Sequence, residues 1–203
     1  MCGRFAITLP SDAMAQLFSA RPANDLPQVP NVNVCPTTQI HTVTSDGADR
    51  HLGAMRWGFV PHWFKTLTDG PLLINARAET IATKPAFAEA CRARRCLIPA
   101  SAFYEWTALD GRKQPWRIAA RDAAPLALAG IWQAWEGHDG PLRTCAIVTT
   151  KANDALSQLH HRMPVIVPPD DWPLWLGETG KGAARLMRPA PEDALSFEVV
   201  EPF

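Results

Sequence analysis

Residue 2 of the chain is a cysteine, and its position could make it chemically active. Methionine aminopeptidases remove an initiator methionine that precedes a small side chain, so we expect the mature chain to begin at Cys2. This residue would then carry a thiol and an α-amine, with unperturbed pKa values of roughly 8.5 and 7.7–8.0, so both nucleophiles need only modest help near neutral pH. Such an aminothiol converts an aldehyde first to an imine and then to a thiazolidine. The alternative is an incidental buried cysteine.

Glu105 is a candidate for proton transfer. It lies within Phe103–Trp106, where both faces of the predicted strand are apolar or aromatic. Burial raises the pKa of a carboxyl group toward the range in which it exchanges protons at neutral pH, which suits a general acid or base. A structural glutamate paired with a buried arginine is the competing interpretation.

Two imidazoles and a guanidinium follow one another at His160, His161 and Arg162, where a predicted helix gives way to a strand. One histidine there could transfer protons. Side chains of adjacent residues point in different directions, so we expect at most one of the two histidines to share a site with Cys2. Either could instead be a structural residue.

Two further segments carry candidate binding residues. If residues 74–79 are extended, Asn75, Arg77 and Glu79 share one face, and an amide beside a fixed cation suits oxyanion or phosphate recognition. A structural hydrogen-bond network is the alternative. The segment Met55–Trp63 mixes aromatic residues with glycine and proline, a composition that could present a ring to an unpaired base, although such rings are often core residues.

Length and composition limit the class of protein that holds these residues. A chain of 203 residues can bury one sizeable core, so we expect a single domain over residues 1–203. Twenty Lys and Arg balance twenty Asp and Glu, so any surface that binds anions must be a local patch. No apolar run is long enough for a membrane span, and we expect a soluble cytosolic protein. Five cysteines without a C-x-x-C pair predict neither a disulfide framework nor a metal site.

The pattern of apolar residues predicts an α+β fold with an antiparallel, barrel-like β core flanked by short helices. Phe5, Ile7 and Leu9 alternate in an opening strand, so Cys2 would stand just before a rigid element. A meander of antiparallel strands should follow Arg95, with turns at Asp110-Gly111 and at residues 137–140. The predicted strands are Gln39–Thr44, His51–Trp57, Arg95–Pro99, Ala102–Thr107, Gln114–Ala119, Leu126–Trp135, Leu142–Thr149, Pro164–Val167 and Phe197–Val200.

Several motifs together resemble the SRAP family of SOS response-associated peptidases or abasic-site-processing proteins. They occur in the family's order and span residues 2 to 167, which makes the set specific although each motif alone is weak. The family's last motif often has an acidic second residue, where this chain has His161. The motifs are Cys2-Gly3-Arg4-Phe5, Arg56–Pro61, Asn75–Glu79, Arg95–Pro99 running into Phe103–Trp106, and His160–Pro164.

The resemblance implies a covalent crosslink between Cys2 and abasic sites in single-stranded DNA, without a cofactor or a metal. Asn75 would orient the amine or the sugar, Glu105 would handle protons during imine formation, and His160 would assist opening of the sugar. An imine that does not close its ring could also permit β-elimination, which is AP-lyase activity. The resemblance further implies that DNA is contacted by Arg4, Trp57, Arg77, Thr149 and Arg162.

The resemblance also implies a monomer of the bacterial cytosol that takes part in a DNA-damage response and binds single strands or junctions of single- and double-stranded DNA. The family's peptidase label would fit an autocatalytic or assisted loss of Met1. Two other functions remain open. Cys2 could serve an N-terminal-nucleophile peptidase that attacks amides, or the arginines and Trp57 could form a non-catalytic module for single-stranded DNA.

Overall fold

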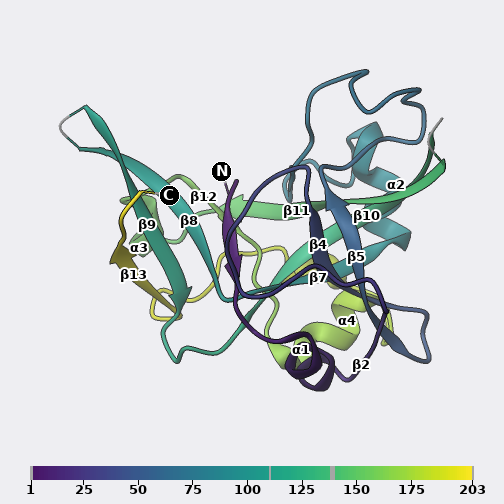
Figure 1. Ribbon diagram of the computed structural model, residues 1–203, viewed down its shortest axis with the longest axis horizontal. Coiled ribbons are helices and arrows are strands. Elements are labelled where there is room, and N and C mark those ends of the chain that lie inside the picture. The colour runs from purple at the N-terminus through teal and green to yellow at the C-terminus, as the bar shows by residue number, and fades with distance from the viewer. Residues whose placement is uncertain (1, 110, 138–139, 203) are drawn as a thin grey trace.

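The computed structural model describes residues 2–109, 111–137 and 140–202, so Met1 and the predicted turn residues Asp110, His138 and Asp139 lie outside the described residues. Two β-sheets make up most of the molecule, with a few short helices (Figure 1). The predicted α+β class with a barrel-like core is confirmed.

The larger sheet follows the strand order β12-β11-β10-β7-β4-β5-β2, with β6 beside β11. An additional pairing between β11 and β5 closes the five strands β11, β10, β7, β4 and β5 into a barrel. Its strands are β2 (Ala20–Pro22), β4 (Gln39–Ser45), β5 (Arg50–Trp57), β6 (Asn75–Arg77), β7 (Arg95–Ala100), β10 (Leu126–Gly137), β11 (Gly140–Lys151) and β12 (Arg162–Pro164).

The smaller sheet has the order β13-β9-β8-β1-β3 and lies beside the barrel (Figure 1). The amino-terminal strand β1 belongs to this sheet and lies between its long β8–β9 hairpin and the barrel. The start of the chain is therefore near the junction of the two sheets. The strands of the smaller sheet are β1 (Phe5–Ile7), β3 (Asn31–Val34), β8 (Ala102–Leu109), β9 (Arg112–Ala120) and β13 (Leu195–Val199).

Short helices cover the barrel at its ends and sides. In Figure 1, α1 and α4 lie below the barrel and α2 lies beside β10. No helix in the described part of the chain is long and apolar enough to cross a membrane. The helices are α1 (Ser11–Phe18), α2 (Pro85–Ala93), α3 (Asp154–Ser157) and α4 (Trp172–Leu176), with 3₁₀ turns at Pro169–Asp171 and Ala183–Leu186.

The expected antiparallel meander after Arg95 is wrong in its connections. β7 pairs with β10 and β4 in the barrel, whereas β8 and β9 form a hairpin in the smaller sheet. The chain changes sheets at Ser101, whose N–H donates to the carbonyl of Ala6 at 2.7 Å. Periodicity places residues on faces of a strand but does not choose its neighbours, so this change of sheet left no signal in the sequence. The barrel is also closed by a parallel pair, β11 with β5.

The opening strand is shorter than its alternating pattern predicts. It ends at Ile7, and all three of its residues are buried on both faces of the strand. The ring of Phe5 packs against Trp57 of β5, with the ring centroids 5.3 Å apart. Alternation is expected only where one face of a strand meets water. This doubly buried strand anchors the chain directly after Cys2.

A buried histidine in the barrel should make the fold sensitive to acid. His41 of β4 is 2% exposed, and burial lowers its pKa from 6.5 to about 4. The unfolded chain therefore binds this proton more readily, and stability is lost as the pH falls from about 6.5 to about 4. We predict a loss of about 3 kcal/mol attributable to this side chain. Urea unfolding at both pH values should show a smaller loss in His41→Leu than in the wild type. The control His62→Gln, at an exposed histidine without an ion pair among the described residues, should lose as much as the wild type.

Candidate active site

The pairing of β1 with β8 places Cys2 near Glu105. Phe5 lies opposite Phe103, and the N–H of Tyr104 donates to the carbonyl of Arg4 at 3.0 Å. Continued toward the start of the chain, this register sets Gly3 opposite Glu105. Cys2 is fully buried, and the Glu105 carboxylate is close enough to raise the pKa of its thiol.

Asn75 approaches the same point from the barrel. It begins β6, which runs parallel to β11 and pairs Asn75 with Ile147. The side-chain Nδ2 of Asn75 donates to the carbonyl oxygen of Cys2 at 3.1 Å. Its Oδ1 is buried and has no hydrogen-bond partner among the described residues. A buried amide with one half unused is suited to hold a further group beside Cys2.

His160 completes the cluster from the segment between α3 and β12. Its backbone N–H donates to the carbonyl of Leu156 at 3.0 Å. The ring Nδ1 lies 3.0 Å from the backbone nitrogen of Arg162 and 4.0 Å from Oε1 of Glu105. The expectation that the two adjacent histidines would point in different directions is wrong, although His161 is exposed and His160 is the one that approaches Glu105. The ring of His161 stacks on that of His160 with centroids 4.4 Å apart and an interplanar angle of 28°, because the chain bends here instead of continuing as a helix or strand.

Burial shifts the two proton-transfer groups in opposite directions. Glu105 is 3% exposed, and desolvation raises the pKa of its carboxyl group. His160 is half-buried, and desolvation lowers the pKa of its imidazole. The shifts bring an acid and a base together without a strong ion pair between them. The two pKa values therefore move toward neutral pH, where each group can take up or release a proton at a small cost in free energy. General acid–base catalysis requires this.

The thiol is less readily ionised than the sequence suggests. Burial raises the pKa of Cys2 well above its ordinary value, and the nearby Glu105 charge raises it further. The expectation that the thiolate would need only modest help is therefore wrong, because a desolvated thiolate next to a carboxylate is unfavourable. A neighbouring base has to accept the proton as the sulfur forms its bond. The other four cysteines are also free thiols, so no disulfide constrains this one.

Arg162 and Thr149 lie beneath the cluster and support it. The guanidinium of Arg162 is buried and pairs with Glu79, with Nη1 2.7 Å from Oε1 and Nη2 2.9 Å from Oε2. Nη2 also donates to the carbonyl of Thr149 at 2.8 Å. The side chain of Thr149 is fully buried, as is that of Cys2, and its contact with DNA stays a prediction. Arg162 keeps only Nε without a partner among the described residues, and its main role here is to hold the segment that carries His160.

Trp57 is not the aromatic residue that could meet DNA bases. Its side chain is fully buried between the sheets, and Nε1 donates to the carbonyl of Ile74 at 2.9 Å. The predicted contact with DNA is therefore corrected: this ring is part of the core, as the alternative interpretation held. The exposed ring of the segment is Trp63, which is 48% exposed and follows Pro61 in the loop after β5. Composition alone could not separate the two tryptophans.

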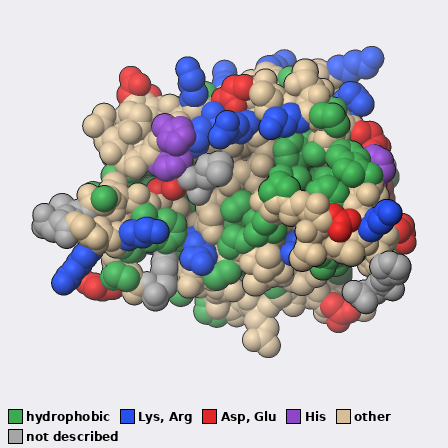
Figure 2. All heavy atoms as spheres, turned by 90° about the horizontal axis from the view of Figure 1, so that it is seen from above, with side chains coloured by type: hydrophobic (Ala, Val, Ile, Leu, Met, Phe, Trp, Pro, Cys, Tyr) green, Lys and Arg blue, Asp and Glu red, His purple; other side chains and the backbone are tan. Residues whose placement is uncertain are grey.

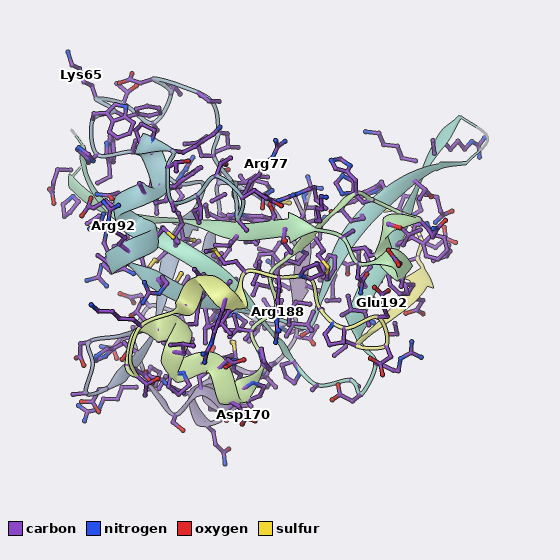
Figure 3. All side chains as sticks on the ribbon, turned by 180° about the vertical axis from the view of Figure 1, so that it is seen from behind. Lys65, Arg77, Arg92, Asp170, Arg188 and Glu192 are labelled. Carbon is purple, nitrogen blue, oxygen red and sulfur yellow. The ribbon has the colours of Figure 1, made fainter. Side chains whose placement is uncertain are left out.

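Cations surround the cluster on one face of the molecule. Figure 2 shows a row of Lys and Arg side chains next to histidine side chains, with hydrophobic side chains on the other side of the row. Arg77 is exposed at the end of β6, and Figure 3 shows it above β11, pointing away from the sheet. Arg4 is half-buried, and its Nε has no hydrogen-bond partner among the described residues. This face suits an anionic ligand.

The arrangement supports chemistry on a small electrophile next to a phosphate chain. One buried nucleophile, one acid and one base meet at the sheet junction, and unpaired buried atoms of Arg4 and Asn75 remain available. Within the described ranges, no three His, Cys, Asp or Glu side chains group closely enough to hold a metal ion. The cluster therefore has the groups for nucleophilic catalysis by the chain's own side chains.

Sequence reasoning missed two parts of this arrangement. It named Glu79 only as a neighbour of Asn75, whereas the structure shows it as the partner of Arg162 in β12. It also expected His160 and His161 to point in different directions, whereas their rings stack. Glu79 and Arg162 are far apart in the sequence, and the two histidines lie at a bend of the chain. Neither arrangement produces a periodic pattern, so no signal in the sequence could have shown these contacts.

Comparisons with known proteins show the family to which the chain belongs. The family model described as "SOS response associated peptidase (SRAP)" matches residues 1–202, and the chain belongs to this family. It is 41% identical over 185 residues to "Abasic site processing protein YoaM" of Bacillus subtilis, covering 87% of this chain and 79% of that protein. It is 30% identical over 192 residues to "Abasic site processing protein YedK" of Escherichia coli, covering 92% of this chain and 85% of YedK.

A solved structure supports the fold independently. A protein from Bacteroides thetaiotaomicron superposes with a TM-score of 0.88 at 24% sequence identity, covering 98% of this chain and 92% of that one. The resemblance inferred from the ordered motifs is thus confirmed at the level of the family.

The support given to Arg162 can be tested through stability. We predict that Glu79→Gln lowers the free energy of unfolding by about 1–2 kcal/mol, because it weakens the pairing of a buried guanidinium while Glu79 itself remains partly exposed. The matched control is Glu198→Gln, whose partner Arg117 is exposed and 3.8 Å away, and it should cost less than about 0.5 kcal/mol. Equal losses in urea unfolding would show that the buried pair has no special role.

Proposed function

We propose that this protein acts on DNA that contains abasic sites and captures the abasic sugar covalently through Cys2. Membership of a family whose relatives are named abasic site processing proteins supports the substrate. The observation that carries the chemistry is the buried Cys2 beside Glu105, with Asn75 bonded to its carbonyl and one amide atom of Asn75 left unused. An aldehyde is the electrophile for which an amine and a thiol on one residue are matched.

The reaction proceeds in two bond-forming steps once Met1 has been removed. The α-amine of Cys2 adds to the aldehyde of the ring-opened sugar, and the carbinolamine loses water to give a protonated imine. The sulfur then adds to the imine carbon, and its proton leaves, so the product is a thiazolidine and one water molecule. The thiazolidine has no good leaving group on the sugar carbon, which makes it more persistent than the imine.

Glu105 and His160 supply the proton transfers that these steps need. Glu105, with its raised pKa, gives a proton to the departing hydroxyl of the carbinolamine and is then ready to accept one. The thiol of Cys2 is protonated at rest, so the carboxylate that has just formed is the suitable base for its proton. His160, neutral because of its lowered pKa, assists opening of the sugar ring, and Asn75 orients the amine.

DNA would lie across the cationic face as a single strand. Arg4 and Arg77 are placed to contact phosphates, and Arg162 can add one contact through Nε. The exposed ring of Trp63 is available to stack on an unpaired base or on the end of a duplex at a junction. A cluster built entirely from one chain is consistent with a monomer. An imine that escapes ring closure would give weak AP-lyase activity.

The crosslink should depend on both groups of Cys2. We predict that Met1-processed wild type and an abasic oligonucleotide form a species that persists on heating in a denaturing gel. Cys2→Ser retains the amine and should form only an imine, which is lost on heating unless it has first been reduced with borohydride. A stable shifted band from unreduced Cys2→Ser, or no band from wild type, would overturn the proposal.

The pH dependence should identify Glu105 as the group that transfers protons. Its protonated form is needed at the start, to give a proton to the departing hydroxyl, so the crosslinking rate of wild type should fall as the pH rises through a pKa above the ordinary 4.5. A second fall, toward acid, should come from protonation of the amine. In the profile of rate against pH, Glu105→Gln should lack the fall that is due to Glu105, and it should react about 100-fold more slowly. Glu198→Gln, at an exposed carboxylate, should keep the wild-type profile of rate against pH measured under single-turnover conditions.

Two alternatives are separated from this proposal by simple assays. A peptidase of the N-terminal-nucleophile kind would turn over a peptide in trans, whereas covalent capture predicts no turnover, even if the same groups help to remove Met1. A non-catalytic DNA-binding module would bind intact and abasic strands equally and would be indifferent to blocking of the amine. Salt dependence would not distinguish this module from covalent capture, since both neutralise phosphates.

A further inference from the structure

A cavity separate from the Cys2 cluster opens at one end of the barrel, where two of its strands cease to pair. β5 and β11 are joined through two residue pairs, Thr144 with Arg56 and Cys145 with Trp57. Beyond these pairs the two strands separate, and a cleft of about 700 Å³ lies between the β4–β5 hairpin and the β10–β11 hairpin. That volume lies within the range of small-molecule sites, which occur at the mouths of barrels. Arg143 of the cleft is six residues along β11 from Thr149, which corresponds to roughly 20 Å from the Cys2 cluster.

The floor of this cleft is an unusual glycine. Gly53 stands in the middle of β5 opposite Thr42 of β4, and its φ is not positive, so no turn requires it. A Cβ added to Gly53 would meet no atom within 4 Å. Glycine in a strand interior costs stability and often marks a place that another molecule approaches closely. Here its lack of a side chain keeps the floor open, with the half-buried Thr44 nearby, while the buried Thr42 hydroxyl donates to the Gly53 carbonyl at 3.4 Å.

One wall of the cleft carries an aromatic ring and a cation. Trp132 of β10 and Arg143 of β11 both line it, and the Arg143 Cζ lies 5.5 Å from the centroid of the indole. Arg143 is exposed and makes no ion pair with another residue of the described chain. On the opposite rim, Arg21 is exposed and pairs with Asp49 at 3.0 Å. A planar ring could therefore lie on the open floor against the indole, with an anionic group at the guanidinium.

We propose that this cleft binds one nucleotide, with its base over Gly53 beside Trp132 and its phosphate at Arg143. The Thr44 hydroxyl can donate to or accept from the polar edge of the base, and an arginine is the natural partner of a phosphate. The nucleotide can be free in solution or one unit of a DNA strand whose abasic site lies at Cys2. Both sources share the same chemistry, and the experiment below separates them.

The test uses Cys2→Ser protein, so that covalent capture of abasic sites plays no part in it. Isothermal titration calorimetry would measure binding of deoxynucleoside monophosphates and, separately, of intact single-stranded oligonucleotides. Gly53→Leu fills the floor at a position where the structure has room for a side chain, and Arg143→Ala removes the phosphate contact. Arg188→Ala, at an arginine that lines a different cavity, is the matched control.

We expect monophosphates to bind and both cleft variants to weaken that binding roughly ten-fold or more, with Arg188→Ala unchanged. If the cleft serves a strand, the oligonucleotides should bind more tightly than the monophosphates and lose affinity in the same two variants. Binding that neither cleft variant changes, or no binding of either ligand, would overturn the proposal. If Gly53→Leu proves unfolded by its thermal unfolding curve, Arg143→Ala decides the result alone.

Discussion

The contact on which the site depends is the short antiparallel pairing of β1 with β8. Three buried residues, Phe5 to Ile7, fix the direction of the chain, and the bond from the Tyr104 N–H to the Arg4 carbonyl extends the register toward Cys2. A chain terminus is ordinarily mobile. Here it is held between two sheets, so that a thiol and, after loss of Met1, an amine are positioned against Glu105. Covalent chemistry at a terminus requires this kind of anchorage because orientation is a large part of the rate.

Burial then sets the protonation states that the reaction starts from. The same dry environment raises the pKa values of Cys2 and Glu105 and lowers that of His160, so all three groups favour their neutral forms. A neutral thiol is protected from oxidation and becomes reactive only when a proton acceptor is generated beside it. The order of events, imine first and sulfur second, follows from this arrangement. In the proposed reaction the outer cations would bind the DNA strand without disturbing these states.

How much could be read from the sequence differs between the fold and the site. Strand positions and the α+β class followed from the spacing of apolar residues, and the residues of the cluster followed from their chemistry and from ordered motifs. The pairing of the strands did not follow from the sequence. The change of sheet at Ser101 and the parallel pairing of β11 with β5 depend on contacts between distant residues, which leave no local pattern. For the same reason the sequence could not show that Trp57 lies in the core or that Arg162 pairs with Glu79. The bend that stacks His161 on His160 was equally invisible.

The most direct test of the central claim is the intact mass of the protein before and after incubation with an abasic oligonucleotide. The account predicts a chain without Met1, which gains the mass of the oligonucleotide less one water molecule. That gain should disappear when the terminal amine is acetylated beforehand. A protein that retains Met1 and still forms the adduct, or an acetylated protein that forms it at the same rate, would contradict the account.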